Sequence, residues 1–88
     1  MLKGIKIKDG GGLDHWTYKS CYAQFATGKN WATLYLVQSS EEGKGHATTL
    51  LIEAKKHYET QNKFVAGSVP LNGRMAELYE KVGYKYYT

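Results

Sequence analysis

Residues 34–58, LYLVQSSEEGKGHATTLLIEAKKHY, constrain the fold most, because they predict a strand, a glycine loop and a helix in immediate succession. Residues 31–37 form an apolar, β-branched and aromatic run that is too short for most helices, which favours a buried strand. Residues 38–44 interrupt this pattern. Beyond them, apolar side chains recur at helical spacing, at Ala47, Leu50, Leu51, Ala54 and Tyr58. The sequence therefore predicts a helix that begins close to Gly45.

The glycine loop has the composition of an anion site, since Gly43 and Gly45 flank Lys44. The first turn of a helix leaves backbone N–H groups without partners and carries the positive end of the helix dipole, so glycines there let an anion approach the main chain. The alternative is that the two glycines only shape a tight strand-to-helix turn. The loop fits neither the Walker pattern nor the dinucleotide fingerprint, because His46 and Ala47 follow Gly45.

The first third of the chain predicts antiparallel strands. Residues 2–8 alternate apolar residues with lysines, as a short half-exposed strand does, and residues 9–12, DGGG, predict a turn. Residues 13–27 fit either a strand or a helix started by Asp14 and stopped by Gly28; their aromatic and β-branched content favours the strand. We therefore predict a hairpin in which residues 17–26 pair with residues 31–37.

The last third predicts a strand, a helix and a strand. Residues 61–63 end the first helix, and residues 64–69 form a strand that should lie parallel to residues 31–37. Asn72 is placed to cap a second helix, and Gly83 is placed to end it. The apolar positions of that helix are Met75, Leu78, Tyr79 and Val82, and residues 84–87 form a last short strand. The prediction is one α/β domain, residues 1–88, with a mixed sheet: an antiparallel hairpin followed by strand, helix, strand, helix and strand.

The amino-acid composition limits the classes of partner that the protein is expected to bind. The chain has 88 residues, so it folds with little margin and association with itself would help. Its formal charge of +4 favours anionic partners, although its lysines are scattered, which argues against a dedicated nucleic-acid-binding arm. With one cysteine, Cys21, no leader-like start and no long apolar run, we expect a cytoplasmic protein that does not enter membranes. No Cys/His cluster has zinc spacing, so no metal site is expected.

Two motifs resemble the GNAT superfamily of N-acetyltransferases. The first is Glu42-Gly43-Lys44-Gly45-His46-Ala47, which is similar to the family's acetyl-CoA motif between a strand and a helix. The second motif runs from Asn72 to Tyr84, NGRMAELYEKVGY. The resemblance covers about residues 31–84 and is closest to the minimal layout of small phage-type acetyltransferases, which implies a truncated GNAT fold.

The resemblance implies acetyl-CoA as cosubstrate. Backbone N–H groups of residues 43–47 would hold its pyrophosphate, and the strand ending near Val37 would pair with the pantetheine arm while splaying away from residues 64–68. Asn72 would touch the cofactor arm and Tyr79 would stand near the sulfur. The implied cofactor-binding residues are Leu36, Val37, Glu42, Gly43, Lys44, Gly45, His46, Ala47, Asn72 and Tyr79.

The implied chemistry is direct attack of a neutral amine on the thioester carbonyl, which a main-chain N–H of the splayed strand polarises. Tyr79 would be the catalytic acid that protonates the departing thiolate. A phenol with an ordinary pKa of about 10 can donate this proton at neutral pH. The structural alternative for Tyr79 is a core aromatic on the apolar stripe of its helix.

The sequence also departs from the family pattern. Glu42 stands where Gln or Arg is usual, and Met75 replaces a small alanine. The strand and two helices that wall the acceptor site in the family have no counterpart, so the acceptor side should be open. A protein lysine, or a partner subunit in a homodimer, would then complete the site.

Three questions stay open at this level. Asp14 and His15 are the candidates for a general base, and nothing distinguishes them from ordinary solvated side chains. A degenerate acetyltransferase fold used only for binding is a second hypothesis. A nucleic-acid binder that uses scattered lysines and exposed tyrosines is a third.

Overall fold

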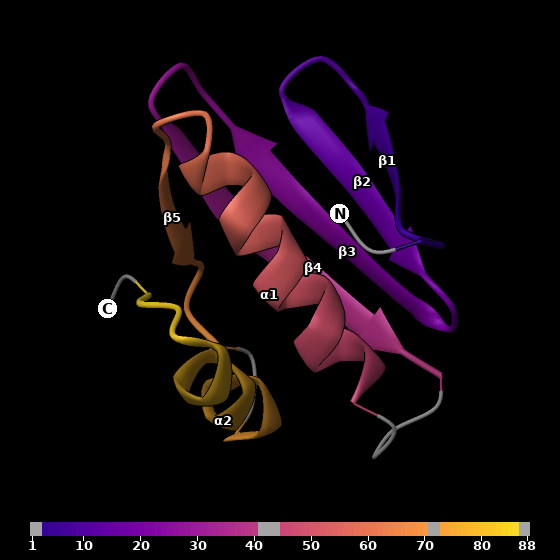
Figure 1. Cartoon of the computed structure of the whole chain (residues 1–88). Coiled ribbons are helices and arrows are strands. Elements are labelled where there is room, and N and C mark those ends of the chain that lie inside the picture. Colours follow the sequence, from indigo (N-terminus) through magenta and orange to yellow (C-terminus); the bar gives the residue numbers. More distant parts are fainter. Residues whose placement is uncertain (1–2, 41–44, 71–72, 87–88) are drawn as a thin grey trace.

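The computed structural model describes residues 3–40, 45–70 and 73–86. Within them the chain forms, in order, β1 (Lys6–Asp9), β2 (Leu13–Tyr18), β3 (Cys21–Thr27), β4 (Trp31–Ser39), α1 (His46–Glu59), β5 (Phe64–Gly67) and α2 (Gly73–Val82). The sheet order is β1-β2-β3-β4-β5; the first four strands are antiparallel and β5 is parallel to β4. Helix α1 lies across one face of the sheet, with α2 beside it (Figure 1). The predicted mixed α+β architecture is confirmed.

One boundary in the antiparallel half was predicted wrongly. Residues 17–26 do not form one strand, because Lys19 and Ser20 make a two-residue turn between Tyr18 and Cys21, which are paired across it. Lys19 takes a φ of 53°, a conformation that usually calls for glycine or asparagine, so this turn carries no ordinary sequence signal. The predicted hairpin is present as β3 and β4, and β1 and β2 extend it to a four-stranded meander.

The predicted last strand is also absent from the described residues. Tyr86 makes only a single parallel bridge to Gly67, and residue 87 lies outside the described ranges. The cause is Tyr84, whose buried hydroxyl donates a 2.7 Å hydrogen bond to the Leu51 carbonyl of α1 and so turns the chain into the core. Strand β5 ends at Gly67, earlier than residue 69.

The helix ends agree with the predictions. Gly45 precedes α1 with a φ of 76°. Asn62 has a φ of 60° and Gly83 a φ of 81°, and each closes a helix with a hydrogen bond from the next residue's N–H to a carbonyl five residues back. Asn72, the predicted cap of α2, lies outside the described residues.

The core lies between α1 and the sheet. Trp16, Phe25 and Leu34 come from three neighbouring strands and are fully buried beneath α1. A hydrogen-bonded chain crosses this layer: Trp16 Nε1 donates to the Tyr58 hydroxyl (2.9 Å), which donates to Asp14 Oδ2 (2.6 Å). Among the described residues, neither helix has the length and apolarity that would let it cross a membrane.

Candidate functional site

The strand β4 contains a β-bulge that divides it into two halves. Phe25 pairs with Leu34 while its neighbour Gln24 pairs with Leu36, so Tyr35 is the extra residue. The bulge shifts by one residue which side chains of β4 face α1. Before the bulge Leu34 is buried under α1, and after the bulge Val37 packs against the same core. Leu36, paired with Gln24, belongs to the face that α1 does not cover.

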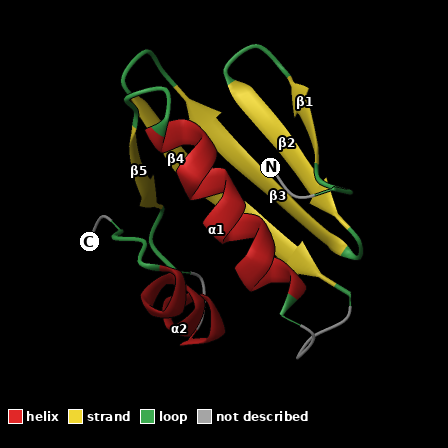
Figure 2. Ribbon diagram, in the orientation of Figure 1, coloured by secondary structure: helices red, strands yellow, loops and turns green. Residues whose placement is uncertain are grey.

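Beyond the bulge β4 separates from β5. Their parallel pairing ends at Leu34 and Gly67, where the Ser68 N–H donates to the Leu34 carbonyl (2.9 Å), whereas β4 continues to Ser39. Residues 35–39 therefore pair with β3 on one side, and the described part of the chain places no strand on the other. Figure 2 shows the two strands side by side at the start of β4 and apart at its end. We call this place the β4–β5 fork.

Tyr79 of α2 lies at the fork. The Tyr79 side chain has no exposed surface. If Gly67 carried a Cβ, that atom would lie 2.5 Å from the Tyr79 Cζ and 2.9 Å from the Tyr79 hydroxyl oxygen. The hydroxyl end of the ring therefore packs directly on Gly67, the last residue of β5. The hydroxyl is buried and has no hydrogen-bond partner within the described ranges. Burial raises the pKa of Tyr79, and the nearby Ser68 side chain opposes this shift in part.

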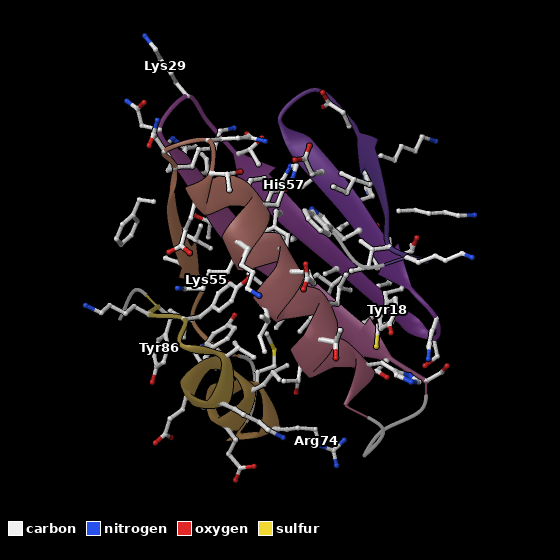
Figure 3. The ribbon with its side chains drawn as sticks, viewed as in Figure 1. Tyr18, Lys29, Lys55, His57, Arg74 and Tyr86 are labelled. Carbon is white, nitrogen blue, oxygen red and sulfur yellow. The ribbon has the colours of Figure 1, made fainter. Side chains whose placement is uncertain are left out.

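The two sequence interpretations of Tyr79 are both visible in this geometry. The ring is a core aromatic, stacked at 14° and 6.2 Å on Tyr84. The hydroxyl, however, is a buried polar atom for which the described residues provide no hydrogen bond of good geometry, and such an atom is costly in a folded protein. Tyr86, labelled in Figure 3, covers the same ring at 5.6 Å.

The start of α1 is where the sequence predicts an anion site. Gly45 has a left-handed backbone, and within the described residues no atom lies within 4 Å of where its Cβ would be and no side chain caps the helix. His46 lies edge-on to Tyr18 at 5.9 Å, and Ala47 packs against the core. The predicted residues Glu42, Gly43, Lys44 and Asn72 lie outside the described residues.

The two candidates for a general base are on opposite faces of β2. Asp14 accepts the hydrogen bond from Tyr58 under α1. His15 lies on the other face, where its Nδ1 is 2.6 Å from the Tyr22 hydroxyl. Strand β3 lies between β2 and β4, so neither side chain belongs to the fork.

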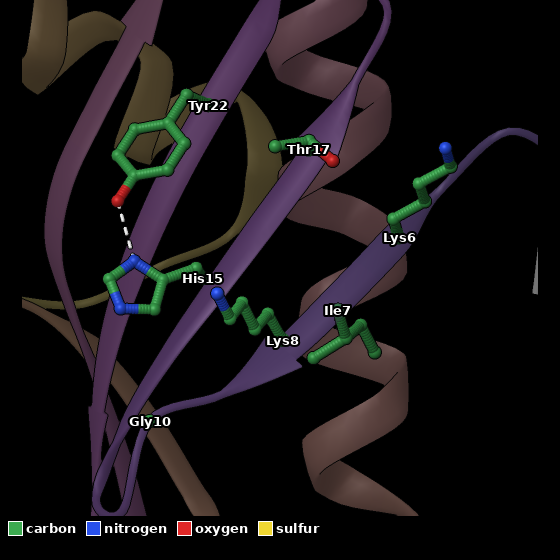
Figure 4. A pocket seen from close by; sticks show the side chains of 7 residues that line it. All are labelled: Lys6, Ile7, Lys8, Gly10, His15, Thr17 and Tyr22. Atoms are coloured by element: carbon green, nitrogen blue, oxygen red, sulfur yellow. Dashed lines mark hydrogen bonds between the residues drawn. The ribbon is translucent and has the colours of Figure 1, made fainter.

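Sequence reasoning missed a hollow on the face that the helices leave open. It has a volume of about 580 Å³ and is lined by Lys6, Ile7, Lys8, Gly10, His15, Thr17 and Tyr22 (Figure 4). The signal was present in the sequence, because His15 and Thr17 alternate with the buried Trp16. Splitting residues 13–27 into two strands is what brings Tyr22 opposite Thr17.

The described residues contain no group of three His, Cys, Asp or Glu side chains that could hold a metal ion. No protein-family model, no curated protein and no solved structure matches the chain.

Proposed function

We propose that the protein is an acetyl-CoA-dependent N-acetyltransferase of the GNAT type, acting on a primary amine, with a protein lysine as the expected acceptor. The observation that carries the proposal is the buried Tyr79 hydroxyl at the β4–β5 fork, which has no hydrogen bond of good geometry among the described residues. A phenol on α2 and a strand edge left open beyond a bulge are the two features that the motif resemblance requires.

Different parts of the chain would bind different parts of acetyl-CoA. The edge of residues 35–39 offers backbone N–H and C=O groups to an extended amide-containing arm, as an open strand edge does for a peptide. At one end of that edge, the start of α1 offers to a diphosphate the positive end of its dipole and the N–H groups of His46 and Ala47, which no side chain of the described residues caps. At the other end, Tyr79 faces the fork.

Acetyl transfer needs one proton donor on the enzyme. The amine nitrogen forms a bond to the acetyl carbon, the carbon–sulfur bond breaks, and the sulfur takes the bonding pair. Tyr79 gives its proton to that sulfur and is reprotonated by solvent, while the amine loses its own proton to water. The raised pKa of Tyr79 keeps the phenol protonated at neutral pH, as an acid must be before the step.

The acceptor side favours a macromolecule over a small amine. The described residues contain α1 and α2 but no further helix that could wall an acceptor pocket, and an open site buries too little of a small ligand to hold it. We therefore expect a lysine presented by another protein in the cytoplasm, or a site at the fork that a second subunit completes.

Isothermal titration with acetyl-CoA tests binding. We expect a Kd below about 1 mM, a free energy of about −4 kcal/mol or stronger. Absence of heat at that concentration, with CoA and with acetyl-CoA, would contradict the enzyme proposal.

Tyr79→Phe tests the chemistry. Loss of a positioned general acid should lower kcat by about 10²- to 10⁴-fold. The acetyl-CoA Kd should stay within about twofold, because the ring that packs on Gly67 is kept. Tyr86→Phe is the matched control, since Tyr86 is partly exposed and contacts the same ring; it should keep full activity in an assay of labelled acetyl transfer to protein lysines.

The second candidate is a binding module with the same fold and no catalysis. The complete burial of the Tyr79 ring favours it, because proton transfer requires the fork to open. In that case Tyr79→Phe would leave the biological activity unchanged, and acetyl transfer would be absent from the wild-type protein as well.

A further inference from the structure

We infer that the helix-free face of the sheet binds single-stranded nucleic acid, independently of the fork. Three observations meet on this face: exposed aromatic rings at the β4–β5 side, a cationic hollow at the β1–β3 side, and the absence of carboxylates among its described residues. A ligand with flat rings and repeated negative charges matches both halves.

The aromatic half consists of Trp31, Tyr35 and Phe64, which are 45%, 64% and 59% exposed. Trp31 and Phe64 are directly paired across the parallel strands β4 and β5, so their side chains are neighbours on one face of the sheet. The Trp31 ring packs directly on Gly28 of the β3–β4 turn, where any side chain would overlap the indole. The ring is therefore held in place before a base stacks on it.

The cationic half is the hollow of Figure 4. Lys6 is paired with Thr17 and Lys8 with His15, so two ammonium groups, a hydroxyl and an imidazole share one side of β1 and β2. Tyr22 holds the imidazole through Nδ1, which leaves Nε2 for another partner. These groups are donors suited to phosphate oxygens.

The absence of negative charge follows from the strand alternation. Asp14 accepts from Tyr58 on the α1 side, and Asp9 is its partner in β1, so both belong to that side. The other carboxylates of the described residues, Glu53, Glu59, Glu77 and Glu80, lie in α1 and α2. Of the lysines that are scattered in the sequence, the fold thus places Lys6 and Lys8 on a face where none of the described carboxylates lies.

The arrangement favours nucleic acid over a second copy of the chain. The outermost strands of the two halves, β1 and β5, are four strand spacings apart, about 19 Å across the sheet, which a few nucleotides can span. A second copy packed face to face would bury Lys6 and Lys8 against a surface whose described residues include no carboxylate to pair with them, at a desolvation cost. Lys29, at the tip of the β3–β4 turn in Figure 3, adds a further charge beside the aromatic half.

Fluorescence anisotropy with labelled single strands of about 12 nucleotides tests the inference. Oligo-dT and oligo-rU distinguish DNA from RNA, and an abasic strand of equal length carries the same phosphates without bases. We expect the base-containing strands to bind more tightly than the abasic one, and binding to weaken between about 50 and 200 mM salt. Equal binding of the abasic strand, or no binding of any strand, would overturn the proposal.

Variants assign the two halves. Trp31→Ala and Phe64→Ala should each weaken binding by about 5- to 150-fold with the salt dependence unchanged, because each removes a stacking surface. The double variant Lys6→Ala/Lys8→Ala should also reduce the slope of log K against log salt by about 1.4, or about 0.7 for each phosphate contact. The control Lys56→Ala/Lys81→Ala removes the same charge from the exposed surface of the two helices, and should leave the slope unchanged.

Two further outcomes count against the proposal. If the helix-side control weakens binding as much as Lys6→Ala/Lys8→Ala, the interaction is with net charge and not with this face. If sedimentation velocity shows a dimer that Trp31→Ala dissociates, a second copy covers the face. Acetyl-CoA titration of the same variants should be unaffected, which separates this result from any failure of the acetyltransferase proposal.

Discussion

At the scale of single residues, the Tyr58 hydroxyl connects helix and sheet. It accepts from Trp16, which is fully buried, and donates to Asp14, which is partly buried. Tyr58→Phe keeps the ring but leaves an indole N–H and a carboxylate without their partner. We expect a loss of about 1–3 kcal/mol in the free energy of unfolding, measured by urea denaturation. Tyr35→Phe, at an exposed position, is the control and should change stability by less than about 0.5 kcal/mol.

A second residue-scale prediction concerns Gly67, whose missing side chain is what admits the Tyr79 ring. Gly67→Ala places a methyl group inside that ring, so we expect a destabilisation of about 1–3 kcal/mol from overpacking. Gly73→Ala is the matched control, because α2 begins there and no atom lies within 4 Å of the new methyl group. It should leave stability unchanged or raise it by up to about 1 kcal/mol. Equal effects of the two changes in thermal unfolding would contradict the contact.

At the scale of elements, the bulge in β4 lets the acetyltransferase proposal be tested apart from folding. Deleting Tyr35 would let Leu34 and Leu36 pair with consecutive residues of β3, with every later side chain of β4 kept on its present face. We expect the circular dichroism spectrum to stay unchanged and acetyl-CoA affinity to fall at least about tenfold, because the edge beyond the bulge shifts by one residue relative to the fork. Retained affinity in titration calorimetry would show that the edge does not bind the cosubstrate.

The elements also show what the sequence can and cannot predict. The succession of β4, α1 and β5 was predictable from the hydrophobic periodicity and the positions of the glycines. A helix with one buried face that connects two parallel strands can pack on the sheet in few ways. The turn at Lys19 did not, since no glycine or asparagine marks its positive φ. The site follows the same division: the position of Tyr79 on α2 was predictable from spacing, but its contact with Gly67 and its partnerless hydroxyl depend on tertiary packing.

At the scale of the whole molecule, tyrosine burial makes stability depend on alkaline pH. Burial is the largest cause that raises the pKa of Tyr58, Tyr79 and Tyr84 above the ordinary value of 10. The unfolded chain loses these protons near pH 10 while the folded chain keeps them, so above that pH the unfolded state binds fewer protons and the free energy of unfolding falls. Below pH 10 the contribution is fully present.

The expected size of this effect is about 1.4 kcal/mol per pH unit for each tyrosine that stays protonated in the folded chain, or about 3 kcal/mol per unit for Tyr58 and Tyr84 together, and Tyr79 adds to it in the same direction. Urea denaturation at several pH values above 10 measures the slope, and absorbance of the tyrosinate ion follows titration directly. Tyr84→Phe should reduce the slope by about 1.4 kcal/mol per unit, because it removes one of the groups that titrate only on unfolding. One result would contradict this prediction: ionisation of all eight tyrosines together near pH 10 while the circular dichroism spectrum of the folded protein persists. The rings of Tyr58, Tyr79 and Tyr84 would then be accessible to water. The buried fork around Tyr79, the proposed acid, would not exist as described.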